Sequence, residues 1–203
     1  MDHPDDAWIG TLIADPVRQA DWRAFVAALH EAARAGGPLE GWLFHGTSAS
    51  RARKIAREGV ITSESLARAD GMTGHEDWFW TAGTHWGHPK VAAFYAEDLI
   101  ESSGRSKLDL AIVAVPLSEL EASGPFSADG QSIDCPLYTR LGRTQAETDA
   151  LWDSSKQDSQ ASLAVLGSLL VLGPVGPEAL RVLRSAADVE DLVREASAPV
   201  PGR

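Results

Sequence analysis

The chain has 203 residues, a formal net charge of −11 and a pI of about 4.9, and 44% of its residues are hydrophobic. This length suits a single domain, and the hydrophobic content excludes a disordered chain. The acidic balance argues against generic binding of nucleic acid, because like charges repel at long range.

The first ten residues, MDHPDDAWIG, are acidic and lack the apolar stretch of a secretory signal. No apolar run reaches the roughly 18 residues that a membrane span needs. Cys135 is the single cysteine of the sequence, so the chain alone forms no disulfide, and no local signature supports a catalytic role for this thiol. These features predict a cytoplasmic protein without a membrane partner.

In chain order, the first predicted element is an amphipathic helix over 15–37, which Asp15 caps and Gly36-Gly37 end. A short strand over 41–46 follows, and then a basic helix over 48–59, which Ser48 or Ser50 is expected to cap and Gly59 to end. The inward face of the first helix is expected to hold Trp22, Phe25, Val26 and Leu29.

The middle of the chain reads as a loop over 59–77, a strand over 78–82, a helix over 88–104 and a central strand over 108–117. The inward side of the helix over 88–104 is expected to hold Val91, Phe94, Tyr95 and Leu99.

The pattern weakens over 118–160, where only TQAETDALWDSS favours a helix. The apolar run 161–172 predicts another strand, 178–185 an edge strand and 187–196 a final helix. This mixture predicts an α+β fold in one domain over 1–203. Its parts are an N-terminal helix over 15–36, a core over 41–185, and a C-terminal helix and tail over 186–203.

Three consecutive residues, His45-Gly46-Thr47, interrupt the apolar strand. The glycine allows a ligand to approach the backbone closely, the histidine can donate a ring N–H to a ribose hydroxyl, and the threonine adds a second polar group. A turn with a hydrogen-bonded histidine is the alternative interpretation, since three residues are a short motif.

Aromatic residues supply two more candidates. Trp80, in the stretch WFWTAGTHWG, is either a core residue or the wall of a pocket for a flat ring. Tyr95 is either packed in the core with a bonded hydroxyl or placed to stack on nicotinamide. Exposed Trp78 or Trp86 is a candidate for docking a partner protein.

Other kinds of site have weaker support in the sequence. His75, His85 and His88, with Glu76 and Asp77, are metal-ligand types, but their spacing matches no zinc signature, so no metal is expected. The sequence has no GxGxxG, no GxxxxGK[ST] and no GxSxG, which excludes the usual Rossmann, P-loop and serine-hydrolase motifs.

The order of five short motifs resembles the ADP-ribosyltransferase fold, and most closely its histidine–tyrosine branch, which includes diphtheria toxin and the poly(ADP-ribose) polymerases. The resemblance covers 41–117 and extends weakly over 167–183. The motifs are LFHGTS, AxxIxxxGV, FWTA, VAAFYA and AIVAVPL.

This resemblance implies a split β-sandwich with flanking helices, in which two small sheets hold NAD as substrate. His45 would bind the adenosine-side ribose and the Gly46 backbone the nicotinamide carboxamide, with Thr47 beside them. Tyr95 would stack on nicotinamide, and Trp80 and Thr81 would line the cofactor pocket.

The reaction that the resemblance implies needs an anion. Loss of nicotinamide leaves positive charge on the ribose, and a fixed carboxylate stabilises that charge. The family places a glutamate at the start of its late strand, where this chain has Ser168. Gln160 and Ser162 are nearby polar candidates, and Glu147 or Asp149 is a candidate to reach in from upstream.

The leading functional hypothesis is therefore an NAD-dependent mono-ADP-ribosyltransferase whose acceptor is a protein, a nucleic acid or a small molecule. A non-catalytic module that binds NAD or ADP-ribose is one alternative, and a small interaction domain unrelated to NAD is another. An RNA 2′-phosphotransferase of the same fold is also open, but it needs basic residues around the phosphate. The sequence clusters only four such residues, Arg51, Arg53, Lys54 and Arg57.

Overall fold

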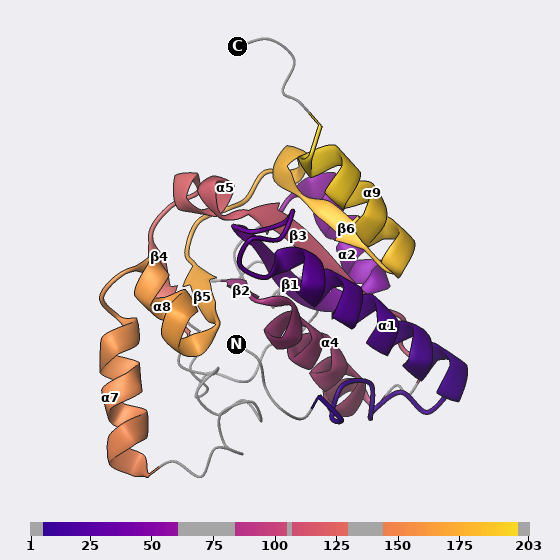
Figure 1. Ribbon diagram of the computed structural model, residues 1–203, viewed down its shortest axis with the longest axis horizontal. Helices are drawn as coiled ribbons and strands as arrows, with labels where there is room; N and C mark the ends of the chain where they lie inside the picture. Colours follow the sequence, from indigo (N-terminus) through magenta and orange to yellow (C-terminus); the bar gives the residue numbers. More distant parts are fainter. Residues whose placement is uncertain (1–5, 61–83, 105–106, 130–143, 199–203) are drawn as a thin grey trace.

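The computed structural model describes residues 6–60, 84–104, 107–129 and 144–198 (Figure 1). Within these residues, six antiparallel strands form one sheet in the order β4-β5-β2-β1-β3-β6. The strands are β1 (Trp42–Ser48), β2 (Thr84–Gly87), β3 (Leu110–Pro116), β4 (Phe126–Ala128), β5 (Ser168–Val171) and β6 (Arg181–Leu183). The α-helices are α1 (Pro16–Ala33), α2 (Ala49–Glu58), α4 (Pro89–Ser103), α5 (Leu117–Ala122), α7 (Gln145–Ser155), α8 (Ser159–Leu166) and α9 (Ala186–Ala196). The α+β prediction is confirmed.

Helices cover both faces of the sheet. Phe44 and Ile112 point into the core that α1, α4 and α9 complete, whereas Leu43 and Val113 belong to the core on the side of α2, α5 and α8. Figure 1 shows α1 and α9 lying side by side, with α7 at the far edge beyond α8. In the described ranges, every helix is too short or too polar to cross a bilayer.

Local capping chemistry explains where the predicted helices begin and end. Asp15 accepts hydrogen bonds from the backbone N–H groups of Val17 and Arg18 at the start of α1. Ser48 caps α2 in the same way through Arg51 N–H, and Gly59, with φ of +80°, ends it. These boundaries lie within a few residues of the predicted ones, because a cap is a local signal.

The region after Leu117 differs from the prediction. The apolar run 161–172 is not one strand: its first part belongs to α8, which Asp158 caps, and β5 starts only after Gly167. Helix α5 and strand β4 were not predicted. The strand predicted over 78–82 lies outside the described residues, and β2 is found just after it.

Helix α4 lies unusually close to β1. A Cβ atom added at Gly46 would be 1.8 Å from the carbonyl oxygen of Ala92 and 2.7 Å from the backbone nitrogen of Ala96. The part of α4 that meets β1 at this point therefore consists of small residues, Ala92 and Ala96. Of the predicted inward residues, Val91 is buried, Phe94 and Tyr95 are half-buried and pack against the core, and Leu99 is half-buried. The glycine of the His-Gly-Thr motif is thus required by helix packing.

Two buried side chains of α4 hold the N-terminal segment. The Glu97 carboxylate accepts from Gly10 N–H at 2.9 Å and from Trp22 Nε1 at 2.8 Å. Lys90 Nζ lies 3.0 Å from a carboxylate oxygen of Asp6. Burial raises the pKa of Glu97 above its usual value, and the hydrogen bonds from Gly10 and Trp22 oppose that rise.

Candidate functional site

The structure gathers three predicted site residues, His45, Tyr95 and Ser168, around two residues that the sequence analysis did not place together, His85 and Asp129. The five come from β1, α4, β5, β2 and the residue directly after β4. Because these elements meet at the middle and one edge of the sheet, residues from five separate segments form one hydrogen-bonded cluster.

The carboxylate of Asp129 is the centre of this cluster. Its Oδ2 atom accepts from Tyr95 OH at 3.2 Å, from Ser168 Oγ at 2.9 Å and from His85 Nδ1 at 3.0 Å, and the side chain is fully buried. Strand pairing explains the position of this carboxylate. Ala128, the last residue of β4, lies opposite Leu169, so Asp129, the residue after it, lies opposite Ser168. Three donors on one oxygen suit an ionised carboxylate, which only accepts hydrogen bonds.

The ring of His85 lies between Asp129 and Tyr95. Its centroid is 5.0 Å from that of the Tyr95 ring, and 21% of the side chain is exposed. Since Nδ1 donates to a carboxylate, the neutral ring carries its lone pair on Nε2. Among the described residues Nε2 has no hydrogen-bond partner and is not enclosed, so it is accessible from outside.

His45 is held in one tautomer by the backbone of β2. Its Nδ1 lies 2.8 Å from the carbonyl oxygen of His85, and a carbonyl only accepts, so Nδ1 carries the hydrogen. Burial lowers the pKa of His45 to about 4, helped by the positive charge of Arg51 and opposed by the bond to the His85 backbone. At neutral pH the remaining nitrogen of this ring, Nε2, therefore accepts a hydrogen bond, whereas the sequence analysis expected the ring to donate to a ribose hydroxyl; the predicted contact with ribose stays a prediction.

This lowered pKa predicts a pH effect on stability. Between pH 6.5 and about 4 the unfolded chain binds a proton at His45 that the folded chain does not, so folding loses stability as the pH falls through that range. We expect a loss of about 3 kcal/mol by pH 4 from this group. His45→Asn keeps an N–H donor for the His85 carbonyl but cannot titrate. Urea unfolding of both proteins at several pH values should show a smaller fall in the variant; equal falls would contradict the assignment.

The rings of His45 and Tyr95 reach the cluster from opposite faces of the sheet. The His45 ring packs 5.4 Å from the ring of Trp86 on the side of α2, whereas Tyr95 belongs to α4 on the other side. Both reach His85, one through its backbone carbonyl and the other through its ring.

Strands β1 and β2 separate beside this cluster. Among the described residues they pair only at Phe44↔Gly87, although continuing that register would place Gly46 opposite His85. The His85 carbonyl instead accepts from the side chain of His45. The ladder between the two strands therefore ends beside the His-Gly-Thr motif.

The other predicted residues divide into buried, exposed and undescribed ones. Thr47 is 2% exposed in β1, and Ser162 donates to the backbone oxygen of Ser168 at 2.6 Å. Gln160 is exposed on α8. Trp80 and Thr81 lie outside the described residues.

The acids proposed to reach in from upstream do not do so. Glu147 and Asp149 are exposed on α7, where Glu147 forms a capping box with Thr144. Helix α7 packs against α8 at the edge of the fold and directs these carboxylates to solvent. The prediction that either supplies the missing anion is wrong; the carboxylate beside Ser168 belongs to Asp129.

The residues proposed for metal binding or protein docking lie mostly outside the described residues or are buried. The described residues contain no group of three metal-ligating side chains, while His75, Glu76, Asp77, Cys135 and Trp78 lie outside them. Trp86 was considered as a docking residue, and that is wrong: it is fully buried, and its Nε1 donates to Thr84 Oγ1 at 2.8 Å.

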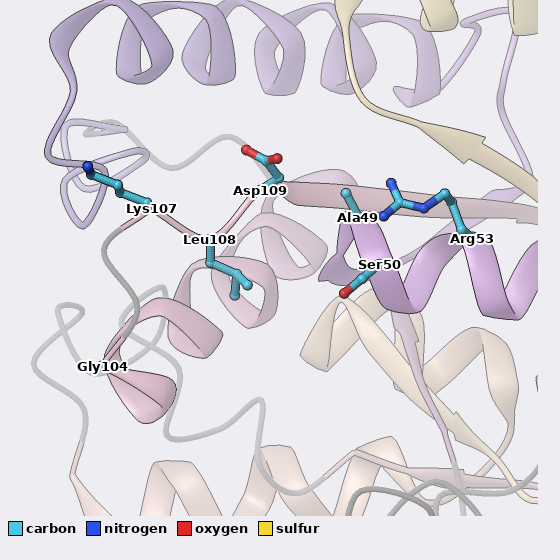
Figure 2. Close-up of a pocket in the computed structure, with 7 residues that line it drawn as sticks. All are labelled: Ala49, Ser50, Arg53, Gly104, Lys107, Leu108 and Asp109. Atoms are coloured by element: carbon cyan, nitrogen blue, oxygen red, sulfur yellow. The ribbon is translucent and has the colours of Figure 1, made fainter.

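A pocket of about 520 Å³ lies away from the cluster, at the start of α2 (Figure 2). Figure 2 shows Ala49, Ser50 and Arg53 on α2, and Lys107, Leu108 and Asp109 on the segment that precedes β3. Its charges are mixed, and the carboxylate of Asp109 already pairs with Arg18 at 3.0 Å. None of the described residues predicted for the NAD site, from His45 to Ser168, lines it.

Comparison with known proteins adds no assignment. No protein-family model matches this chain, and no curated protein does. The resemblance to ADP-ribosyltransferases therefore stays a prediction that rests on the sequence motifs.

Only weak sequence signals mark the two central residues of the cluster, Asp129 and His85. Asp129 precedes a glycine, which is typical of a turn after a short strand, but β4 has only three residues and no clear alternation. His85 was considered only as a metal ligand, because the glycines around THW suggested a turn and concealed β2.

Proposed function

We propose that this chain is an NAD-dependent mono-ADP-ribosyltransferase that cleaves the bond between nicotinamide and ribose. The observation that carries the proposal is the position of the Asp129 carboxylate. It accepts hydrogen bonds from Tyr95, Ser168 and the ring of His85. The backbone carbonyl of His85 in turn accepts from His45. Two residues from separate motifs of the resemblance, Tyr95 and Ser168, thus contact an anion, the kind of group that the family places as a glutamate.

The end of the β1–β2 ladder supports the split-sandwich interpretation of the fold. Within the one sheet, the single pair Phe44↔Gly87 joins the strands β4-β5-β2 to the strands β1-β3-β6. In the proposed complex, nicotinamide enters where these two sets of strands diverge, and its carboxamide meets the backbone edge of β1 at Gly46. The flat ring then stacks on Tyr95.

The chemistry follows from the protonation states. The neutral Nε2 atom of His45 accepts a hydrogen bond from a ribose hydroxyl. As the bond between ribose C1′ and the nicotinamide nitrogen breaks, the electron pair leaves with nicotinamide and positive charge develops on the sugar. The fixed charge of Asp129 stabilises that cation electrostatically, because a buried anion is poorly screened by water.

The experiment is to incubate the protein with NAD and measure released nicotinamide, alone and with candidate acceptors. Tyr95→Ala is expected to weaken NAD binding by roughly 10- to 100-fold, since stacking on a flat base contributes about 1–3 kcal/mol. Tyr95→Phe keeps the ring and is expected to bind NAD nearly as well as the original protein. Leu99→Ala, a partly exposed position on the same helix, is the control. Equal binding by all three variants would contradict the stacking role.

A binding module without turnover is the second candidate, and one observation favours it. Asp129 is fully buried and surrounded by three donors, so its carboxylate does not itself reach a ligand. Tight NAD binding by calorimetry without nicotinamide release would support this function. The RNA 2′-phosphotransferase has less support, because Arg51, Arg53 and Arg57 are exposed on α2 and Arg57 is already paired with Glu58.

A further inference from the structure

We infer that His85 and Asp129 form a general-base pair that takes the proton of a hydroxyl acceptor, so that this enzyme transfers ADP-ribose to hydroxyl groups. The inference rests on the proposed function and adds the acceptor class and the proton acceptor to it. It starts from the hydrogen bond of 3.0 Å between His85 Nδ1 and Asp129 Oδ2.

The geometry of this pair is that of an oriented imidazole base. The carboxylate holds the hydrogen on Nδ1 and leaves the lone pair on Nε2, as in the histidine–aspartate pairs of hydrolases. Asp129 is fully buried, whereas 21% of the His85 side chain is exposed. The anion therefore stays inside and the basic nitrogen faces outward.

The pair lies where an acceptor must approach. The His85 ring is 5.0 Å from Tyr95, which stacks on nicotinamide in the proposed complex, and its carbonyl is bonded to His45. Because the His85 ring lies on the same side as Tyr95, this base is within reach of a nucleophile that attacks C1′ of a ribose whose nicotinamide is stacked on Tyr95. Tyr95 and Ser168 complete the bonds to Asp129 and fix the pair in place.

The transfer of ADP-ribose needs only NAD, the acceptor hydroxyl and the His85 base. The C1′–nitrogen bond breaks and nicotinamide leaves with the electron pair. The acceptor oxygen forms a bond to C1′, and its proton moves to Nε2 of His85. The resulting imidazolium is stabilised by Asp129 and later releases the proton to water.

Proton chemistry selects the acceptor class. A carboxylate acceptor has no proton to lose at neutral pH and needs no base. A guanidinium must lose its proton before it attacks, and its pKa lies far above that of an imidazole, so an imidazole base removes that proton poorly. A hydroxyl becomes strongly acidic only as it bonds to the sugar cation, at which point an imidazole removes its proton readily. The acceptor is therefore an alcohol, a ribose hydroxyl or a hydroxyl side chain.

The test compares two small nucleophiles, azide, which carries no proton, and methanol, which does. The protein is incubated with NAD and both, and ADP-ribosyl azide and methyl ADP-riboside are quantified. His85→Asn keeps an N–H toward Asp129 but has no basic nitrogen. We expect it to lower the ratio of methyl to azide product by about 10²-fold, the usual contribution of a general base. Asp129→Asn should lower the same ratio and also slow formation of both products.

The controls separate the possible outcomes. His30→Asn, on α1, should keep the original ratio, and thermal unfolding checks that each variant is folded; His85→Gln replaces His85→Asn if that variant unfolds. An unchanged ratio in an active His85 variant overturns the general-base role. If the original protein releases no nicotinamide with either nucleophile, the proposed function fails, and the acceptor assignment fails with it.

Discussion

Replacing Asp129 with asparagine is expected to slow nicotinamide release by about 10²–10³-fold, the usual cost of removing one preorganised electrostatic group. Asparagine has nearly the same shape, and its carbonyl oxygen still accepts hydrogen bonds where Oδ2 now accepts three. The variant thus removes the charge and keeps most of the packing. We expect NAD binding to change only slightly, because the buried carboxylate acts on the charge that develops during cleavage.

The measurement is the rate of nicotinamide release at saturating NAD, with calorimetry for NAD binding. Asp98→Asn is the matched control, because Asp98 is an exposed carboxylate on α4 only three residues from Tyr95. Release at the original rate by Asp129→Asn would show that the anion has no part in cleavage. A loss of binding equal to the loss of rate would instead indicate that Asp129 serves only to hold the ligand site together.

Gly46→Ala is expected to destabilise the fold by about 3 kcal/mol or more, at the upper end of overpacking effects. The new methyl group would lie 1.8 Å from the Ala92 carbonyl oxygen. The clash is with helix backbone, which cannot rotate away as a side chain does. To relieve it α4 must move off β1, and Tyr95 moves with α4.

Urea unfolding measures this loss, and Gly36→Ala provides a matched comparison. A Cβ at Gly36 meets nothing within 4 Å, but the residue has φ of +74°. Its cost is only the strain of the left-handed conformation, about 1–2 kcal/mol. If Gly46→Ala is no more costly than Gly36→Ala, the close approach of α4 to β1 is not a requirement of the fold, and the glycine needs another explanation.

The ends of helices could be predicted from the sequence, whereas contacts between distant segments could not. Ser48 and Gly59 marked the ends of α2 because a cap depends only on neighbouring residues. Asp129 could not be predicted, because its meeting with Ser168 depends on β4 pairing with β5 across about forty positions of intervening chain. The apolar run before Gly167 was interpreted as a strand since periodicity alone does not separate a buried helix from a buried strand.

The attachment of the N-terminal segment to α4 has a practical consequence for anyone who shortens this protein. A version starting at Pro16 would retain all five residues of the cluster. It would also remove the Gly10 N–H donor and the Asp6 carboxylate, leaving Glu97 with Trp22 as its one remaining donor in the described chain and Lys90 without its counterion. Lys90 and Glu97 are on the same helix as Tyr95, so the trimmed protein would lose contacts that hold α4, and with it the ring that the proposed reaction needs, in place. Deletions at this end are therefore unsuitable for studying the site, although they touch none of its residues.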